Sequence, residues 1–335
     1  MTTLQISPLL DPALKAATVA LAEAAALADG VQPLSEAVRL TLAPGHGADA
    51  GAGRHLVALD DTGSVIGYAH LDLTADAADA AEPADPESGP VAELVVAPER
   101  RGHGIGALIL EAALAEAEHE RPEAPLKVWA HGSSPAALAL AARHGLVEVR
   151  RLLQMRRSLA VPLPPVALPQ GFEVSTFRPG VDDRVWLDLN RRAFAHHPEQ
   201  GRWTATDLSA RLAEPWFDPA GFFLVTPQSE PGTPSPGPVG FHWTKVEREP
   251  GAEPLGEVYV VGIDPAAQGR GLGKALTLIG LHHLAERGVA EVALYVESDN
   301  APARAVYEGL GFTIWGEDVL FGRTGGSIVH VNVTR

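Results

Sequence analysis

The hydrophobic and polar positions of the chain form short strand-like runs that alternate with helix-like patterns. Apolar residues dominate runs such as 65–71 and 91–96, which predicts buried strands. The run 91–96 is followed by glycines and then by leucines spaced as on a helix, at Leu108, Leu110 and Leu114. The first part of the chain therefore predicts helices over 10–28, after these glycines and from near Pro135, with strands over 56–59, 65–71, 91–96 and 126–130.

The same succession of elements returns in the second part of the chain. Residues 262–273 align with residues 95–106, with a proline and three glycines in register. The offset of about 166 residues also pairs Ser134 with Asn300. Each copy is therefore a whole domain of mixed α/β structure. The second copy predicts helices over 182–195, after the glycines and from near Pro302, with strands over 222–226, 239–246, 257–263 and 292–296.

A proline-rich segment separates the two copies. Residues 159–171 contain four prolines, which disfavour a regular helix and favour an extended, semi-rigid connector. We therefore predict an N-terminal domain over residues 1–158, a linker over 159–171 and a C-terminal domain over 172–335. The length of 335 residues agrees with two domains of ordinary size.

The composition, 46% hydrophobic and 20% charged, is typical of a soluble globular protein and excludes wholesale disorder. The absence of cysteine excludes disulfides and thiolate metal sites, and we expect a cytoplasmic protein. The alanine-rich run 13–28 carries Lys15 and Glu23, so it predicts a helix and no signal or membrane span. A formal charge of −16 disfavours nucleic acid and anionic membranes as partners. The same charge mildly favours a cationic or polar substrate but names none, and we expect a monomer.

The glycine-rich turn before a helix is the strongest chemical signal. Residues 268–273 read Gln-Gly-Arg-Gly-Leu-Gly between a predicted strand and a helix, and residues 101–106 repeat the glycine spacing. Glycine permits positive φ and close approach of an anion, while backbone N–H groups and the helix end supply positive potential. A single turn of this kind is more often a plain tight turn, but two copies in register favour a phosphate site. Added charge would come from Arg100, Arg101, Arg270 and Lys274.

Two common phosphate motifs do not fit these turns. The Walker pattern fails because the segment from Gly269 to Lys274 is one residue short and Ala275 replaces the required Ser or Thr. The Rossmann fingerprint needs glycines after the first strand of a domain and an acidic residue on the following strand. Here the glycines lie in the middle of each domain, and only Glu297 is a loose candidate for the acidic residue.

Both turns instead resemble the acetyl-CoA signature of the Gcn5-related N-acetyltransferase (GNAT) family, which is Arg/Gln-x-x-Gly-x-Gly/Ala at the start of a helix. Residues 101–106 and 268–273 both match this signature. The second copy also resembles the family at residues 295–300 and 305–312, whereas the first copy departs most. The resemblance covers nearly the whole chain. It implies an α/β protein of two tandem GNAT domains, each a mixed, mostly antiparallel twisted sheet flanked by helices.

The resemblance implies that acetyl-CoA is the acetyl donor and that no metal is needed. Its pantetheine arm would bind like an added strand to backbone groups of Val261 and Ile263, and the glycine turn would hold the pyrophosphate. The implied contacts in the C-terminal copy are Val261, Gly262, Ile263, Gln268, Gly269, Arg270, Gly271, Leu272, Gly273, Lys274, Asn300, Ala301, Pro302, Ala303, Arg304 and Ala305. Those in the N-terminal copy are Leu94, Val95, Val96, Arg101, Gly102, His103, Gly104, Ile105, Gly106 and Ala107.

Acetyl transfer to an amine needs a base for the amine proton and an acid for the leaving sulfur. The resemblance assigns these roles to Glu257, directly or through water, and to Tyr307. The plainer interpretations are a surface carboxylate on a strand and a core tyrosine with a satisfied hydroxyl. The repeat places Pro90 opposite Glu257 and Ala141 opposite Tyr307. We therefore predict that only the C-terminal domain catalyses, while the N-terminal domain holds acetyl-CoA without chemistry.

The tandem arrangement resembles the branch of the family that acetylates the cysteinyl amine of cysteinyl-glucosaminyl-inositol. From the residues alone, single charged side chains near proline-rich loops are more often simply solvated. The residues that the resemblance implies as contacts for this substrate are Glu36, Glu199, Lys245, Glu257 and Tyr295.

Other activities stay open at this point. An acetyltransferase for another small amine or for a protein N-terminus would share the cofactor site and differ only in the acceptor pocket. A non-catalytic acetyl-CoA-binding module is a third interpretation, against which the presence of Glu257 and Tyr307 argues. The adjacent histidine pairs 196–197 and 282–283 do not predict a metal site, because neighbours on a helix point apart and no zinc spacing is completed.

Overall fold

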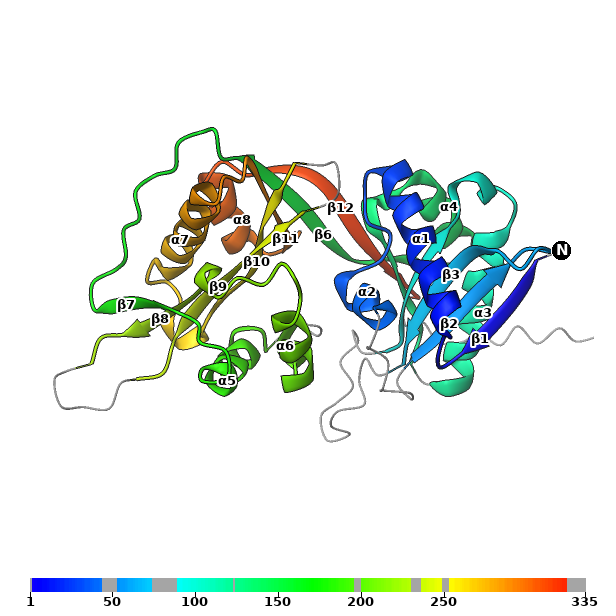
Figure 1. The fold of residues 1–335 in the computed structure, drawn as a ribbon, viewed down its shortest axis with the longest axis horizontal. Helices are drawn as coiled ribbons and strands as arrows, with labels where there is room; N and C mark the ends of the chain where they lie inside the picture. The colour runs from blue at the N-terminus through cyan, green and yellow to red at the C-terminus, as the bar shows by residue number, and fades with distance from the viewer. Residues whose placement is uncertain are drawn as a thin grey trace, which may run out of the picture. The chain divides into compact units, whose positions relative to one another are not determined.

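Two groups of strands, each covered by helices on both faces, organise the chain (Figure 1). The computed structural model describes residues 2–43, 53–73, 89–122, 124–195, 200–229, 236–248 and 253–323. These residues divide into an N-terminal unit, Met1–Arg151 with Glu317–Arg335, and a C-terminal unit, Leu152–Gly316. Mixed α/β structure is thus confirmed in both parts of the chain. Within the described residues, no helix is long and apolar enough to cross a membrane.

The described strands of the N-terminal unit lie in the order β1-β2-β3-β4-β5-β12, and only the pair β4–β5 is parallel. Side chains alternate between the faces of each strand, so Tyr68 of β3 packs under α1 and α2 while Leu71 packs under α3 and α4. The elements are β1 (Thr3–Ser7), α1 (Pro12–Asp29), α2 (Glu36–Leu42), β2 (Gly53–Leu59), β3 (Val65–Asp72), β4 (Val91–Val96), α3 (Ile105–Glu120), β5 (Lys127–Ala130), α4 (Pro135–Arg143) and β12 (Thr313–Gly322).

The described strands of the C-terminal unit lie in the order β6-β11-β10-β9-β8-β7, and again one pair, β10–β11, is parallel. Trp186 of α5 and Phe241 of β9 belong to an aromatic core, whereas Leu281 of α7 and Val292 of β11 belong to a second, mainly aliphatic core. The elements are β6 (Val147–Ser158), β7 (Phe172–Thr176), α5 (Asp183–Ala193), α6 (Ala205–Leu212), β8 (Phe222–Pro227), β9 (Gly240–Glu247), β10 (Leu255–Ile263), α7 (Leu272–Glu286), β11 (Glu291–Glu297) and α8 (Ala301–Gly309).

Helix starts follow ordinary capping chemistry. Asp11 accepts a hydrogen bond from the Leu14 N–H at 2.8 Å and caps α1, which has Pro12 in its first turn. Thr204 and Asp207 form a capping box at α6. The two helices after the glycine turns differ, because neither α3 nor α7 has a side-chain cap. Their first N–H groups are therefore available to a ligand.

The last strand of each repeat belongs to the unit of the other repeat. Strand β6 follows α4, yet from Leu152 onward it pairs with β11 of the C-terminal unit. Strand β12 ends the described chain, yet Val319–Phe321 pair with β5 of the N-terminal unit. The units therefore change over near residues 151 and 316, unlike the predicted domain limits at 158 and 172. The predicted linker, residues 159–171, contains no helix or strand.

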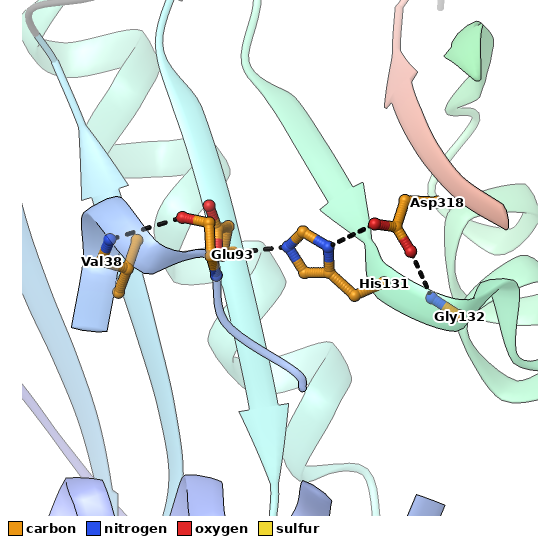
Figure 2. Close-up of polar contacts among 6 residues, drawn as sticks. Val38, Glu93, His131, Gly132 and Asp318 are labelled. Atoms are coloured by element: carbon orange, nitrogen blue, oxygen red, sulfur yellow. Dashed lines mark hydrogen bonds and ion pairs between the residues drawn. The ribbon is translucent and has the colours of Figure 1, made fainter. Parts of the chain in front are cut away.

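A buried charged cluster ties β12 to the N-terminal unit (Figure 2). His131, which directly follows β5, has Nε2 3.3 Å from Glu93 Oε2 and Nδ1 3.2 Å from Asp318 Oδ2. The Gly132 N–H donates to Asp318 Oδ1 at 2.8 Å, and the Ser35 N–H donates to Glu93 Oε2 at 2.6 Å. Both carboxylates are buried. We refer to Glu93, His131 and Asp318 as the charged cluster.

The charged cluster holds His131 as a cation. Burial opposes the charged form of His131, but hydrogen bonds to Asp318 and Glu93 outweigh it and raise the pKa to about 10. Burial likewise opposes ionisation of Glu93, yet the hydrogen bond and charge of His131 and the bond from Ser35 keep the pKa of this carboxyl below its ordinary value. His131 is therefore a largely buried cation between the buried carboxylates of Glu93 and Asp318.

The raised pKa of His131 predicts a pH-dependent stability. The folded state binds the proton more tightly than the unfolded state, where histidine has a pKa near 6.5. The stabilisation is therefore complete below about pH 6.5 and is lost as pH rises toward about 10. Urea unfolding from pH 7 to pH 10 should show wild type losing about 1 kcal/mol per pH unit more than His131→Asn. His119 is exposed, so His119→Asn should show the same change of unfolding free energy with pH as wild type. If His131→Asn also showed the wild-type change with pH, the assignment of the cation to His131 would be wrong.

Helix α7 packs so closely on β9 that Gly280 has no room for a side chain. A Cβ at Gly280 would overlap the ring of His242, which is fully buried and donates from Nδ1 to the Leu276 carbonyl at 2.7 Å. Burial lowers the pKa of His242 to about 4, so the ring is neutral at pH 7.

Gly280→Ala should therefore lower the free energy of unfolding by about 1–3 kcal/mol, because the added methyl overpacks the helix against the sheet. Gly309→Ala in α8 is the matched control, since a Cβ there meets nothing within 4 Å. That control should change stability by less than about 1 kcal/mol. Urea unfolding of the two variants checks this; equal stability of Gly280→Ala and wild type would show that α7 can shift.

Candidate functional site

Strands β10 and β11 separate halfway along their length. They pair in parallel only from Leu255 to Glu257, although β10 continues to Ile263 and β11 continues to Glu297. On its other edge β10 pairs with β9 throughout, apart from a β-bulge between Val258 and Val260. No described strand pairs with the β11-facing edge of β10 beyond Glu257. An extended ligand could bind that open edge as an added strand.

The glycine turn lies between the open edge and α7. Gly269 and Gly271 have φ values of +75° and +81°, which L-residues with side chains rarely adopt, and Gly271 is the uncapped N-cap of α7. A Cβ at Gly269 or Gly273 would meet no neighbour within 4 Å, so the space above the turn is open. Arg270 and Lys274 are exposed beside it. Free helix N–H groups, open glycines and two cations fit a pyrophosphate.

The N-terminal unit repeats this turn nearly unchanged. Gly102 and Gly104 have φ values of +77° and +82°, and Gly104 is the uncapped N-cap of α3. Arg101 occupies the position that Gln268 has in the C-terminal turn. Its guanidinium donates to both carboxylate oxygens of Asp29, at 2.7 and 2.8 Å. The backbone cradle for an anion is therefore present twice, while one of its predicted cations is already paired with a carboxylate.

The side chain of Glu257 lies beside a buried ammonium. Glu257 and Lys245 are directly opposite in the β9–β10 register, with Nζ 3.7 Å from Oε2, and Lys245 Nζ lies 2.7 Å from Glu247 Oε1. The Lys245 side chain is 4% exposed and that of Glu257 is 16% exposed. The nearby positive charge favours the ionised carboxylate, which is the form that can accept a proton.

An aromatic wall surrounds this ion pair. The Lys245 ammonium lies 5.1 Å from the ring centre of Trp216 and 5.4 Å from that of Tyr259. Arg211 donates to the Tyr259 hydroxyl at 2.7 Å and stacks over Trp203 at 3.9 Å. Sequence reasoning missed Arg211, Trp203, Trp216 and Tyr259. Trp203 and Trp216 were the available signal, but they lie 29 to 54 residues before Lys245 and Glu257, and only tertiary packing brings them together.

Tyr307 packs in a different core cluster from the aromatic wall. It lies on α8, is partly buried, and packs on the cluster that contains Val258 and Val261 of β10. Burial raises the pKa of its hydroxyl to about 12, so Tyr307 is protonated at neutral pH. This hydroxyl makes no hydrogen bond to another described residue.

Strand register corrects one detail of the predicted repeat. Glu257 lies opposite Ala293 of β11. The counterpart of Ala293 in the first repeat is Lys127 of β5, and Lys127 lies opposite Val91. The counterpart of Glu257 is therefore Val91 and not the predicted Pro90, because the β-bulge in β10 adds a residue between this position and the glycine turn. Valine, like proline, has no proton to exchange. Ala141 and Tyr307 do occupy the same place, the seventh residue of α4 and of α8.

The remaining predicted residues are distributed as follows. Tyr295 on β11 is 50% exposed, and Asn300 caps α8 by accepting from the Ala303 N–H at 3.1 Å. Glu36 is the first residue of α2 in the N-terminal unit. Glu199 and the pair 196–197 lie outside the described residues. His282 contacts the Pro164 carbonyl while His283 contacts Asp218, and the described residues contain no cluster suited to a metal.

Comparison with known proteins agrees with this geometry. A sequence profile described as "Acetyltransferase (GNAT) family" matches residues 26–146 and 184–312. A protein of Acidothermus cellulolyticus named mycothiol acetyltransferase is 50% identical over 327 residues, covering 94% of this chain and 93% of its own length. A protein of the same name from Thermomonospora curvata is 51% identical over 304 residues, covering 90% and 91%.

Solved structures show the same arrangement of elements. A Gcn5-related N-acetyltransferase from Sphaerobacter thermophilus superposes with a TM-score of 0.64 at 25% identity, covering 96% of this chain and 95% of its own. A tandem GNAT protein from the clavulanic acid pathway superposes with a TM-score of 0.67 at 21% identity, covering 97% and 99%. The family profile matches both parts of the chain, and these structures share its fold, in agreement with the open edge of β10 and the two glycine turns. The chain belongs to the GNAT acetyltransferase family.

Proposed function

We propose that the chain transfers the acetyl group of acetyl-CoA to the cysteinyl amine of cysteinyl-glucosaminyl-inositol, forming mycothiol. Relatives that are about half identical over nine-tenths of the chain carry the name mycothiol acetyltransferase. The observation that carries the chemistry is the carboxylate of Glu257 at the point where β10 and β11 separate. The proposal includes a cytoplasmic, monomeric enzyme that acts on one small polar amine.

The residues of the C-terminal unit divide the work of acetyl transfer. Acetyl-CoA supplies an activated thioester. The turn from Gln268 to Lys274 holds the pyrophosphate, and backbone groups of Val261 and Ile263 hold the pantetheine arm at the open edge of β10. We assign polarisation of the carbonyl to the Val261 N–H. The residues 300–305 at the start of α8 flank the bound group on the far side.

Two proton transfers complete the reaction. The Glu257 carboxylate takes a proton from the substrate nitrogen as the N–C bond forms, and the Tyr307 hydroxyl gives a proton to the sulfur as the C–S bond breaks. The Lys245 ammonium beside Glu257 and the protonated hydroxyl of Tyr307 at pH 7 support these roles. We also propose that Glu36, Glu199, Lys245 and Tyr295 contact the substrate. The N-terminal unit, with Val91 and Ala141 at the equivalent positions, would bind acetyl-CoA without chemistry.

Removing either proton-transfer group should slow the reaction while leaving the fold intact. Glu257→Gln should lower kcat about 10²- to 10⁴-fold, and Tyr307→Phe should lower it by a similar order. The measurement is mass spectrometry of acetylated product after mixing protein, acetyl-CoA and cysteinyl-glucosaminyl-inositol. Glu291→Gln on β11 is the matched control, since Glu291 is a solvent-accessible carboxylate paired with Arg156. Unchanged turnover in Glu257→Gln would reject Glu257 as the base. If the wild-type protein bound acetyl-CoA but formed no product, the substrate would be another amine or the protein would be a non-catalytic acetyl-CoA-binding module.

The two glycine turns predict two acetyl-CoA sites of unequal importance. Valine at Gly271 or Gly104 disfavours the φ near +80° by about 1–3 kcal/mol, so we expect the free turn to relax. Restoring the turn on binding would then cost that energy, which corresponds to roughly five- to 150-fold weaker binding. Calorimetry should therefore find two sites in wild type and one tight site in each variant. Gly271→Val should lose product formation, whereas Gly104→Val should keep it. If Gly104→Val lost activity while the C-terminal unit was saturated with acetyl-CoA, the proposal that the C-terminal unit alone catalyses would be contradicted.

A further inference from the structure

The charged cluster of the N-terminal unit ends at the helix that carries Glu36. The Glu93 carboxylate accepts the Ser35 N–H at 2.6 Å, and Ser35 is the N-cap of α2, with its Oγ accepting from the Val38 N–H (Figure 2). Glu36 is the next residue and opens the helix. The position of the Glu36 backbone is therefore set by a hydrogen bond from its neighbour to a buried carboxylate.

Both ends of α2 are attached to the rest of the N-terminal unit. At its C-terminal end, the Lys15 ammonium of α1 donates to the Thr41 carbonyl at 3.0 Å. Along its length, Val38 and Leu42 are buried in the core shared with α1. A helix of two turns has little stability of its own, so these attachments decide where its first residue lies.

The charge of Glu93 is what makes the attachment at Ser35 strong. A backbone N–H bound by a carboxylate forms a shorter and stronger hydrogen bond than one bound by a neutral acceptor. Glu93 stays ionised because the His131 cation lies 3.3 Å away, and His131 in turn is held by Asp318. The N-cap of α2 is thus connected through one continuous set of charged hydrogen bonds to β12.

The C-terminal unit has no such cluster at the equivalent place. The strand register puts Val260 of β10 opposite Trp243 of β9, where the N-terminal unit has Glu93 opposite His70. Val260 and Trp243 are part of the aromatic core, and apolar packing of this kind is often as stable as a buried ion cluster or more so. A buried charged set found in only one of two duplicated units calls for a role other than stability.

We propose that Glu93 is a positioning residue for acetyl transfer: through the Ser35 N–H it holds Glu36 where Glu36 contacts the amine substrate. The proposal rests on the proposed function, because it takes Glu36 as a substrate contact. His131 and Asp318 keep Glu93 charged and in place. Displacing a positioned contact by about an ångström can reduce the rate up to 10²-fold, so the effect should be large enough to measure.

The first test separates substrate binding from chemistry. Glu93→Gln should raise KM for cysteinyl-glucosaminyl-inositol about tenfold to a hundredfold, while kcat and the Kd of acetyl-CoA change less than about twofold. Glu36→Gln should raise the same KM, and the double variant should be no worse than Glu36→Gln alone, because both changes remove one contact. Glu116→Gln on α3, which removes one of the two carboxylates that pair with the partly buried Arg54, is the matched control and should leave all constants unchanged.

The second test needs no substrate. Amide hydrogen exchange at Ser35 and in the first turn of α2 should quicken at least about tenfold in Glu93→Gln and stay unchanged in Glu116→Gln, with α1 unaffected in both. If Glu93→Gln does not fold, Ser35→Pro and Ser35→Ala replace it. Both remove the hydroxyl, but only proline removes the N–H, and the φ of −61° at Ser35 suits proline. Only Ser35→Pro should then raise KM for the amine.

The outcomes distinguish the two proposals. Wild-type protein that binds acetyl-CoA but does not acetylate this amine overturns the proposed function. If the wild-type protein is active, two results overturn the positioning role alone. One is an unchanged KM in Glu93→Gln, and the other is that the effects of Glu36→Gln and Glu93→Gln add in the double variant. A fall in kcat and in acetyl-CoA affinity at constant KM for the amine would also overturn it, since that pattern indicates general damage to the fold.

Discussion

The separation of β10 from β11 after Glu257 is the constraint on which the C-terminal site depends. While the strands pair, their facing backbone groups satisfy one another; where they part, β10 keeps a row of polar groups that only a ligand or water can satisfy. The β-bulge between Val258 and Val260 accompanies this change and re-aims the side chains beyond it. This local irregularity thus accompanies an open strand edge, which we propose as the site of the pantetheine arm.

Duplication with divergence explains the difference between the two units. Both retain the strand, glycine turn and uncapped helix, because backbone geometry alone makes that cradle and almost any surrounding sequence can preserve it. The neighbouring face has changed completely. The C-terminal unit has Lys245 and Glu257 within an aromatic wall, whereas the N-terminal unit has Glu93 and His131 in a buried charged set.

Local patterns predicted most elements and the glycine turns, since apolar spacing, capping residues and glycines act over a few neighbours. The short elements β1, α2, α6 and β7 were missed, as were β6 and β12. Strand pairing is not encoded locally, so the exchange of β6 and β12 could not be anticipated. The contact of His131 with Asp318 spans 187 residues and depends on that exchange. The roles of Glu257 and Tyr307 came from family resemblance, and the bulge shifted the counterpart of Glu257 from Pro90 to Val91.

The exchange of final strands also constrains how the chain matures. Proteins emerge from the ribosome N-terminus first, and most N-terminal domains can finish folding while the rest is still being made. This N-terminal unit cannot, because its outer strand β12 and the Asp318 that faces His131 follow the C-terminal unit, Leu152–Gly316, along the chain. Until β12 arrives, one edge of β5 is unpaired and His131 has Glu93 as a partner but lacks its second carboxylate, Asp318. The duplicated halves therefore reach their final form together, as one product of synthesis and not as two modules made in turn.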